Sequence, residues 1–98
     1  MMSIPDFKPE AAAEADEAFL WYEGQSAGLG LEFMRALDAC MSQILRFPDG
    51  CPISHDGLRR AMLRRFPYGI FYIASEGSST IYAVFHSKRD PLQLVERI

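Results

Sequence analysis

The sequence predicts an α+β domain in which a helical hairpin packs on a small antiparallel sheet. Two stretches with apolar residues at helical spacing fill most of residues 9–47, and three strand-length stretches rich in β-branched and aromatic residues follow in residues 60–86. The 98 residues suit one domain, so residues 1–98 are expected to share one core. The predicted order is strand, helix, helix, strand, strand, strand.

The first predicted elements are a short strand and a helix. Residues 3–7 are predicted as a strand that Pro5 confines to a sheet edge, because proline lacks an N–H donor. Pro9 suits the start of a helix that is expected to end near Gly24. Its apolar stripe consists of Ala11, Ala15, Ala18 and Tyr22, while the side chains expected to face away are Asp16, Glu17 and Glu23. Leu20 falls on the polar side, as either an incidental exposed residue or a partner contact.

A glycine-rich connector and a second helix are expected next. Residues 24–30 read GQSAGLG and are interpreted as a turn, because no phosphate-loop lysine follows these glycines. Helical spacing then returns in Phe33, Ala36, Leu37, Cys40, Met41, Ile44 and Leu45. This helix is predicted to stop at Phe47, since Pro48 disfavours helical geometry in the residue before it.

Residues 60–66, 70–74 and 80–86 are predicted as an antiparallel meander, with FPYG and SEGSS as turns. In the last strand, alternation is expected to separate Ile81, Ala83 and Phe85 from Tyr82, Val84 and His86. In the first, Met62 shares a face with Arg60 and Arg64, opposite Ala61 and Leu63. One face must meet the helices, so at least one arginine pair is expected to lie outside the core.

Composition limits the function classes. The chain is 49% hydrophobic and 23% charged, as in globular proteins, and its net charge of −3 argues against general binding to nucleic acid. Residues 1–50 carry three basic and nine acidic side chains, a net −6, whereas residues 51–98 carry seven basic and four acidic ones, a net +3. Positive charge therefore concentrates in the second half, where a site is expected.

No cofactor, metal site or membrane segment is predicted. The longest apolar run is strand-sized, and the first ten residues lack the pattern of a secretory signal, so a cytoplasmic protein is expected. Cys40 and Cys51 lack metal or redox spacing and are interpreted as packing residues. His55 has no second ligand at metal spacing and is expected in a loop.

Three segments together resemble the RelE/ParE superfamily of bacterial type II toxins. They are WYEGQSAGLGLEF in residues 21–33, RRAMLRRFPYGIFY in residues 59–72 and AVFHSKRDP in residues 83–91. The resemblance covers nearly the whole chain and implies a helical hairpin on an antiparallel sheet. It also implies a cytoplasmic toxin held inactive, in a hetero-oligomer, by an antitoxin encoded next to it.

The resemblance leaves the target open. ParE-like members inhibit DNA gyrase, and RelE-like members cleave ribosome-bound mRNA. The H-x-x-R-D-P ending, the acidic chain and a tail without tyrosine favour the ParE-like branch. If the chain were RelE-like, His86 would be the acid/base catalyst and Arg65 a phosphate contact. A third interpretation is an inactive domain that only binds its partner, so whether the chain is an enzyme stays open.

The residues expected to bind the target or the antitoxin are Arg60, Arg64, Arg65, Arg89, Leu20 and Trp21. Each has a structural alternative. The arginine stems can cover apolar surface, and Trp21 can pack at the rim of the core. His86 can close its strand with a hydrogen bond to the backbone, and Arg89 can form an ion pair with Asp90.

Overall fold

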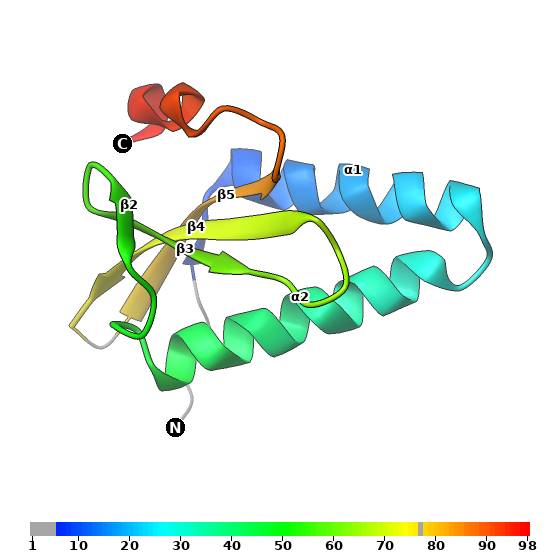
Figure 1. Cartoon of the computed structure of the whole chain (residues 1–98), viewed down its shortest axis with the longest axis horizontal. Coiled ribbons are helices and arrows are strands. Elements are labelled where there is room, and N and C mark those ends of the chain that lie inside the picture. Colours follow the sequence, from blue (N-terminus) through cyan, green and yellow to red (C-terminus); the bar gives the residue numbers. More distant parts are fainter. Residues whose placement is uncertain (1–5, 77) are drawn as a thin grey trace.

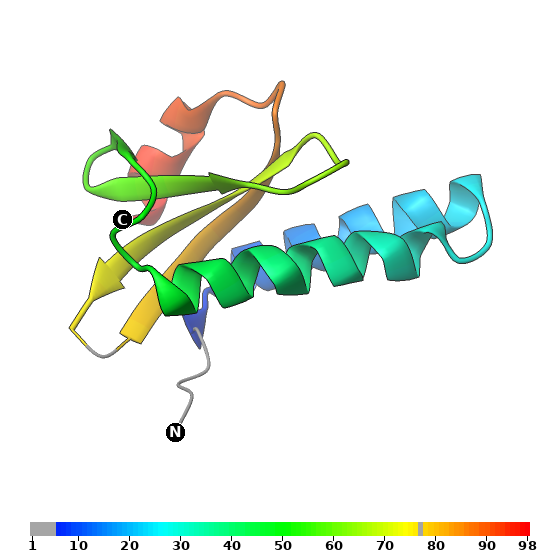
Figure 2. The same cartoon turned by 60° about the horizontal axis from the view of Figure 1, so that its bottom comes forward.

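The computed structural model describes residues 6–76 and 78–98 and places the helices and the C-terminal segment on opposite faces of one sheet. The helices are α1 (Pro9–Gln25) and α2 (Leu29–Arg46), and a 3-10 helix, η1 (Pro91–Arg97), follows the last strand. The strands are β1 (Asp6–Phe7), β2 (Ile53–His55), β3 (Leu58–Met62), β4 (Tyr68–Ser75) and β5 (Ser78–His86). Figures 1 and 2 show the helical hairpin on one side of the sheet and η1 on the other. The predicted α+β class is confirmed.

The described residues form a five-stranded mixed sheet in the order β1-β5-β4-β3-β2. Strands β2 to β5 pair antiparallel, as expected for a meander, but β1 pairs parallel to β5 through Asp6 and Phe7. The expectation of a purely antiparallel sheet is therefore wrong at this edge, because α1 and α2 lie between β1 and the meander in the chain. Residues 3–5 of the predicted first strand lie outside the described residues.

Several boundaries differ from the predictions. The first predicted strand of the meander, 60–66, is found at Leu58–Met62, so it begins two residues earlier and ends four residues earlier than predicted. It ends early because Arg65 adopts φ +69° and turns the chain before β4. The sequence did not predict β2, which ends at His55, so the loop expected there is wrong. Asp56 and Gly57, both with positive φ, form the tight connection from β2 to β3. η1 was also not predicted; the Asp90 side chain caps it by accepting the N–H of Leu92.

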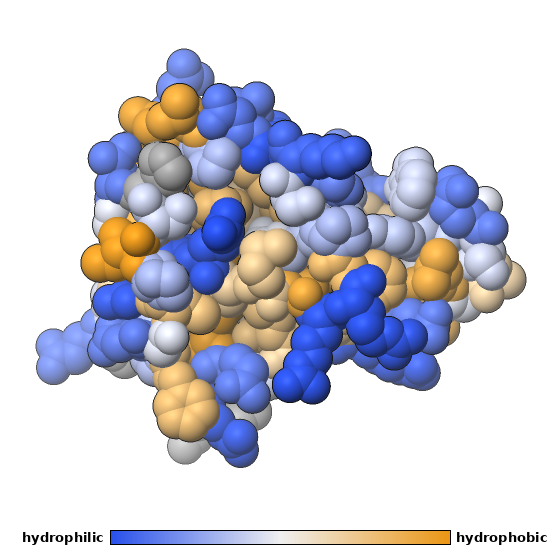
Figure 3. Space-filling view, in the orientation of Figure 1, coloured by the Kyte–Doolittle hydropathy of each residue, from blue (hydrophilic) through white to orange (hydrophobic). Residues whose placement is uncertain are grey.

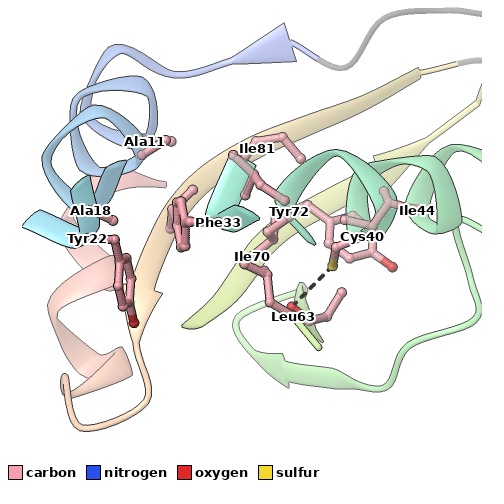
Figure 4. Close-up of a cluster of buried hydrophobic side chains, with 14 residues drawn as sticks. Ala11, Ala18, Tyr22, Phe33, Cys40, Ile44, Leu63, Ile70, Tyr72 and Ile81 are labelled. Atoms are coloured by element: carbon pink, nitrogen blue, oxygen red, sulfur yellow. Dashed lines mark hydrogen bonds between the residues drawn. The ribbon is translucent and has the colours of Figure 1, made fainter. Parts of the chain in front are cut away.

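The main core lies between the helices and the sheet (Figure 4). The predicted stripe of α1 is buried there, and that of α2 is buried at Phe33, Leu37, Cys40 and Ile44, whereas Ala36 and Met41 are half-buried and Leu45 is not part of this core. Ile70, Tyr72 and Ile81 meet the helices from the sheet. The Cys40 Sγ lies 3.7 Å from the carbonyl oxygen of Ala61, the contact dashed in Figure 4. Burial raises the pKa of the Cys40 thiol to about 11, which agrees with an unreactive packing residue.

A second, smaller core lies on the opposite face of the sheet, where η1 covers it. Its buried members are Leu58, Phe71, Ala83, Phe85 and Leu94. The face prediction for β5 is partly wrong, because Phe71 pairs with Ala83 while Tyr72 pairs with Ile81. Tyr82 is the extra residue of this β-bulge, which places Ile81 and Val84 together in the main core.

Candidate functional site

An acidic side chain on α1 joins the helical hairpin to the sheet and to the C-terminal segment. The Glu14 carboxylate accepts the backbone N–H of Val84 at 3.0 Å. It also accepts hydrogen bonds from the Arg89 guanidinium at 3.0 Å and from the Arg97 guanidinium at 2.8 Å. The bond with Glu14 raises the pKa of Arg97. Because β1 ends at Phe7, opposite Ile81, Glu14 satisfies a donor of β5 that lies beyond the end of β1.

Arg89 is held by the domain itself. Besides Glu14, its Nε donates to Gln93 Oε1 at 2.8 Å, and its guanidinium lies 4.1 Å from the centre of the Phe85 ring. The alternative of an ion pair between Arg89 and Asp90 is wrong, because Asp90 caps η1 instead. The charge of Arg89 is thus largely engaged inside the molecule.

His86 lies at the junction of two hollows at the end of the sheet. Its ring meets Tyr68 edge-on at 5.2 Å, and its Nδ1 accepts the backbone N–H of Lys88 at 3.1 Å. This is the backbone bond expected as the structural alternative. Because Nδ1 is an acceptor here, the neutral ring carries its proton on Nε2.

The first hollow, here called the sheet-end hollow, measures about 100 Å³ and lies on the face of the sheet away from the helices. It brings together Arg60, His86 and Arg89, three of the predicted site residues. Gly69 provides the room, because a Cβ there would lie 2.9 Å from the Met62 sulfur and 3.3 Å from the Arg60 Cγ. The Arg60 stem therefore lies across β4.

The other arginines of residues 59–65 lie apart from this hollow. Arg64 and Arg65 occupy the turn between β3 and β4, where Figure 3 shows strongly hydrophilic side chains beside apolar atoms over the strands. Arg65 is 78% exposed and lies 3.8 Å from Glu32, a pair that contributes about 0–1 kcal/mol. Arg59 instead donates to the carbonyl oxygen of Cys51 and pairs with Asp49 at 3.3 Å. It fixes the segment before β2.

The second hollow, here called the α1 cleft, measures about 240 Å³ and lies between α1 and the paired ends of β4 and β5. Trp21 lines it and is 59% exposed, whereas Leu20, 67% exposed, is not among its lining residues. The full lining consists of Glu14, Glu17, Ala18, Trp21, Tyr68, Val84, His86 and Arg89. Burial and, secondarily, the charge of Glu17 raise the pKa of Tyr68.

The glycine-rich connector is a structural device. The Glu23 carboxylate accepts the N–H groups of Gly28 at 3.0 Å and Gly30 at 2.9 Å, which satisfies free donors at the start of α2. Glu23 therefore does not simply face away, as the helical pattern predicted. Gly28 has φ +89°, and a Cβ on Gly30 would lie 2.9 Å from the carbonyl oxygen of Phe19.

The structure thus divides the predicted residues between three places: the sheet-end hollow, the β3–β4 turn and the exposed end of α1. Sequence reasoning missed Glu14, Glu17, Tyr68 and Arg97. Glu14 left a detectable signal, because it lies three residues after Ala11 and four before Ala18, inside the apolar stripe of α1.

The described residues contain no group of three or more histidine, cysteine, aspartate or glutamate side chains that could hold a metal ion. Within the same residues, neither α1 nor α2 combines the length and apolar character needed to cross a bilayer.

Comparisons with known proteins give a likeness in fold. The sequence matches no family model and no curated protein. The fold matches a chain in the solved structure of the chromosomal ParDE TA system from P. aeruginosa, with a TM-score of 0.61. The match covers 87% of this chain and 96% of that one, at 18% sequence identity. The expected resemblance is confirmed at the level of the fold: this chain has the fold of a protein from a ParDE system.

Proposed function

We propose that this protein is the toxin of a type II toxin-antitoxin module, and that it arrests growth by inhibiting DNA gyrase. The shared fold with a chain of a ParDE TA system carries the proposal. A cognate antitoxin, encoded beside the toxin, neutralises it in a cytoplasmic hetero-oligomer. The contact residues proposed for target or antitoxin are Arg60, Arg64, Arg65, Arg89, Leu20 and Trp21.

The electrostatics around His86 favour inhibition by binding over RNA cleavage. Cleavage by attack of a 2′-hydroxyl needs an acid/base group and free positive charge on the developing phosphorane. Arg89 is already bound to Glu14, and the α1 cleft beside His86 also contains the Glu17 carboxylate. These carboxylates oppose a phosphate next to the imidazole.

The alternative is a ribosome-dependent endoribonuclease of the RelE type. The observation in its favour is that Arg60, His86 and Arg89 line the same sheet-end hollow. In that case His86 would act as acid/base catalyst, with Arg60 beside it. Arg65, the other catalytic candidate, sits on the β3–β4 turn and would have to reach the RNA from there.

Induction in a bacterial host, with and without the neighbouring reading frame, tests the proposal. We expect growth arrest that the neighbouring product relieves, no new RNA 5′-ends in translated messages, and inhibition of DNA supercoiling by purified gyrase. New cleavage sites that disappear in His86→Ala would establish the nuclease instead. Absence of arrest would leave only an inactive partner-binding domain.

Charge reversal on the β3–β4 turn tests the contact surface. Arg65→Glu should weaken arrest or antitoxin affinity while the thermal midpoint stays unchanged, because Arg65 is exposed and only loosely paired with Glu32. The matched control is Arg35→Glu on the exposed side of α2, which should change neither. A large fall in the midpoint of Arg65→Glu would assign Arg65 to packing.

A further inference from the structure

The α1 cleft has two aromatic walls, and each of them packs against neighbouring rings. Tyr68 packs against Tyr22, Phe33 and His86, with ring centres 5.2–6.1 Å apart. On the other side, Trp21 meets Tyr22 edge-on at 5.0 Å. A ligand entering between Trp21 and Tyr68 therefore finds preformed apolar surfaces, which lowers the entropic cost of binding.

The charged side chains of the cleft determine the charge of the ligand that it favours. Of the charged side chains that line it, Glu14 and Glu17 are acidic and Arg89 is basic, which sums to −1. Arg89 bonds to Glu14 and offsets that carboxylate, and Arg97, which also bonds to Glu14, is not among the lining residues. Glu17 is exposed, and none of the ion pairs found among residues 6–76 and 78–98 includes it. The carboxylate of Glu17 is therefore the uncompensated charge that the cleft offers a ligand.

An acidic ligand fits this arrangement poorly. It would meet Glu17 directly, and the positive charge of Arg89 is already paired with Glu14 through a hydrogen bond of 3.0 Å. A basic side chain fits well, because its aliphatic stem can lie on aromatic walls while its cation reaches Glu17 and the face of an indole. The net charge of −3 on the whole chain adds long-range attraction for a basic ligand.

The surface beside the cleft indicates that the ligand is part of a protein. Leu20, next to Trp21 in α1, is 67% exposed, and Trp21 is 59% exposed. Exposed tryptophan beside an exposed leucine is typical of a docking site, in which a few anchors contribute most of the binding energy.

We propose that the α1 cleft receives an arginine or lysine side chain from a partner protein, and that an apolar side chain of the same segment packs on Leu20. The assignment of this partner as the antitoxin rests on the proposed function. The cleft and its preference for a basic segment do not.

The test uses peptides and the single tryptophan of the chain as a probe. A six-residue peptide of leucine, arginine and alanine is titrated into isotope-labelled protein, alongside the same peptide with glutamate for arginine. We expect the basic peptide to shift the Trp21 indole signal and the amide signals of Tyr68 and His86 in a saturable way. The acidic peptide should leave them in place.

Variants then distinguish binding in the α1 cleft from general electrostatic attraction to the protein. Glu17→Gln should weaken binding of the basic peptide about two- to fivefold, which is the usual range for an exposed ion pair. Trp21→Ala, followed through Tyr68 and His86, should weaken it by more than about fivefold. The matched control is Asp16→Asn, the same charge change on a residue that lines the groove between α1 and α2 instead. It should alter binding less than about twofold.

Three results would overturn the proposal: no shift with the basic peptide, stronger binding of the acidic one, or equal weakening by Asp16→Asn and Glu17→Gln. Because these titrations need neither a target nor growth arrest, their failure is distinguishable from failure of the toxin assignment.

Discussion

At the scale of single residues, Glu14 connects more of the molecule than any of the residues first predicted as a site. Its side chain is 10% exposed, and its carboxylate accepts hydrogen bonds from the Val84 N–H in β5, from Arg89 after β5 and from Arg97 in η1. A buried carboxylate is costly unless it is fully bonded, and here the bonds come from three separate segments. The end of β5 and η1 are therefore tied to α1 through one side chain.

The variant Glu14→Gln should lower the free energy of unfolding by about 1–3 kcal/mol, the usual range for charge-assisted hydrogen bonds. Glutamine keeps the shape but replaces one acceptor oxygen with an NH2 donor and removes the negative charge, so both arginines lose their shared anion. Urea denaturation measures the change. Glu17→Gln, which alters an exposed side chain nearby, should stay within about 0.5 kcal/mol. Equal stability of the two variants would show that the Glu14 bonds add little.

At the scale of elements, the connection between α1 and α2 depends on close backbone approach. In Figures 1 and 2 this connection extends beyond the sheet, so the sheet does not support it. The Glu23 carboxylate stabilises the connection instead, because it accepts the N–H groups of Gly28 and Gly30. Gly30 is also buried against Phe19. The motif WYEGQSAGLG thus encodes a tight helical hairpin.

We expect Gly30→Ala to destabilise the protein by about 1–3 kcal/mol, because its Cβ would overlap the Phe19 carbonyl and the Glu23 carboxylate. The matched control is Gly24→Ala inside α1, where a Cβ would meet nothing within 4 Å. That change should be neutral or stabilise the fold by up to about 1 kcal/mol. Thermal or urea unfolding of both variants compares them, and an equal effect would contradict the packing argument.

At the scale of the whole molecule, the sheet is buried on both faces, by the hairpin on one and by η1 on the other. η1 has three residues per turn, so residues three apart lie on the same side. Leu94 and Arg97 lie on the side that faces the sheet, whereas Leu92, Val95 and Ile98 lie on the exposed side. Leu94 is fully buried against Leu58, Phe71 and Phe85. The C-terminal segment is therefore part of the fold.

Leu94→Ala should cost about 2–5 kcal/mol, as for other large-to-small changes in a core. Leu92→Ala, on the exposed row of the same helix, should stay within about 0.5 kcal/mol. Hydrogen exchange adds a regional readout: amides of β3 and η1 should lose protection in Leu94→Ala before those of α2. Uniform loss across the chain would mean that η1 and the main core unfold as one unit.

The sequence alone determined the α+β class, the helical hairpin and the meander, because apolar periodicity is local and each helix repeats its stripe several times. It also placed Leu20 on the exposed side of α1. The tertiary structure decided the parallel pairing of β1, the bulge at Tyr82 and the cover formed by η1. It likewise decided which charges are free, since Arg89 is bound by Glu14, 75 residues away in the chain. Such pairings depend on contacts between distant segments, which no local pattern records.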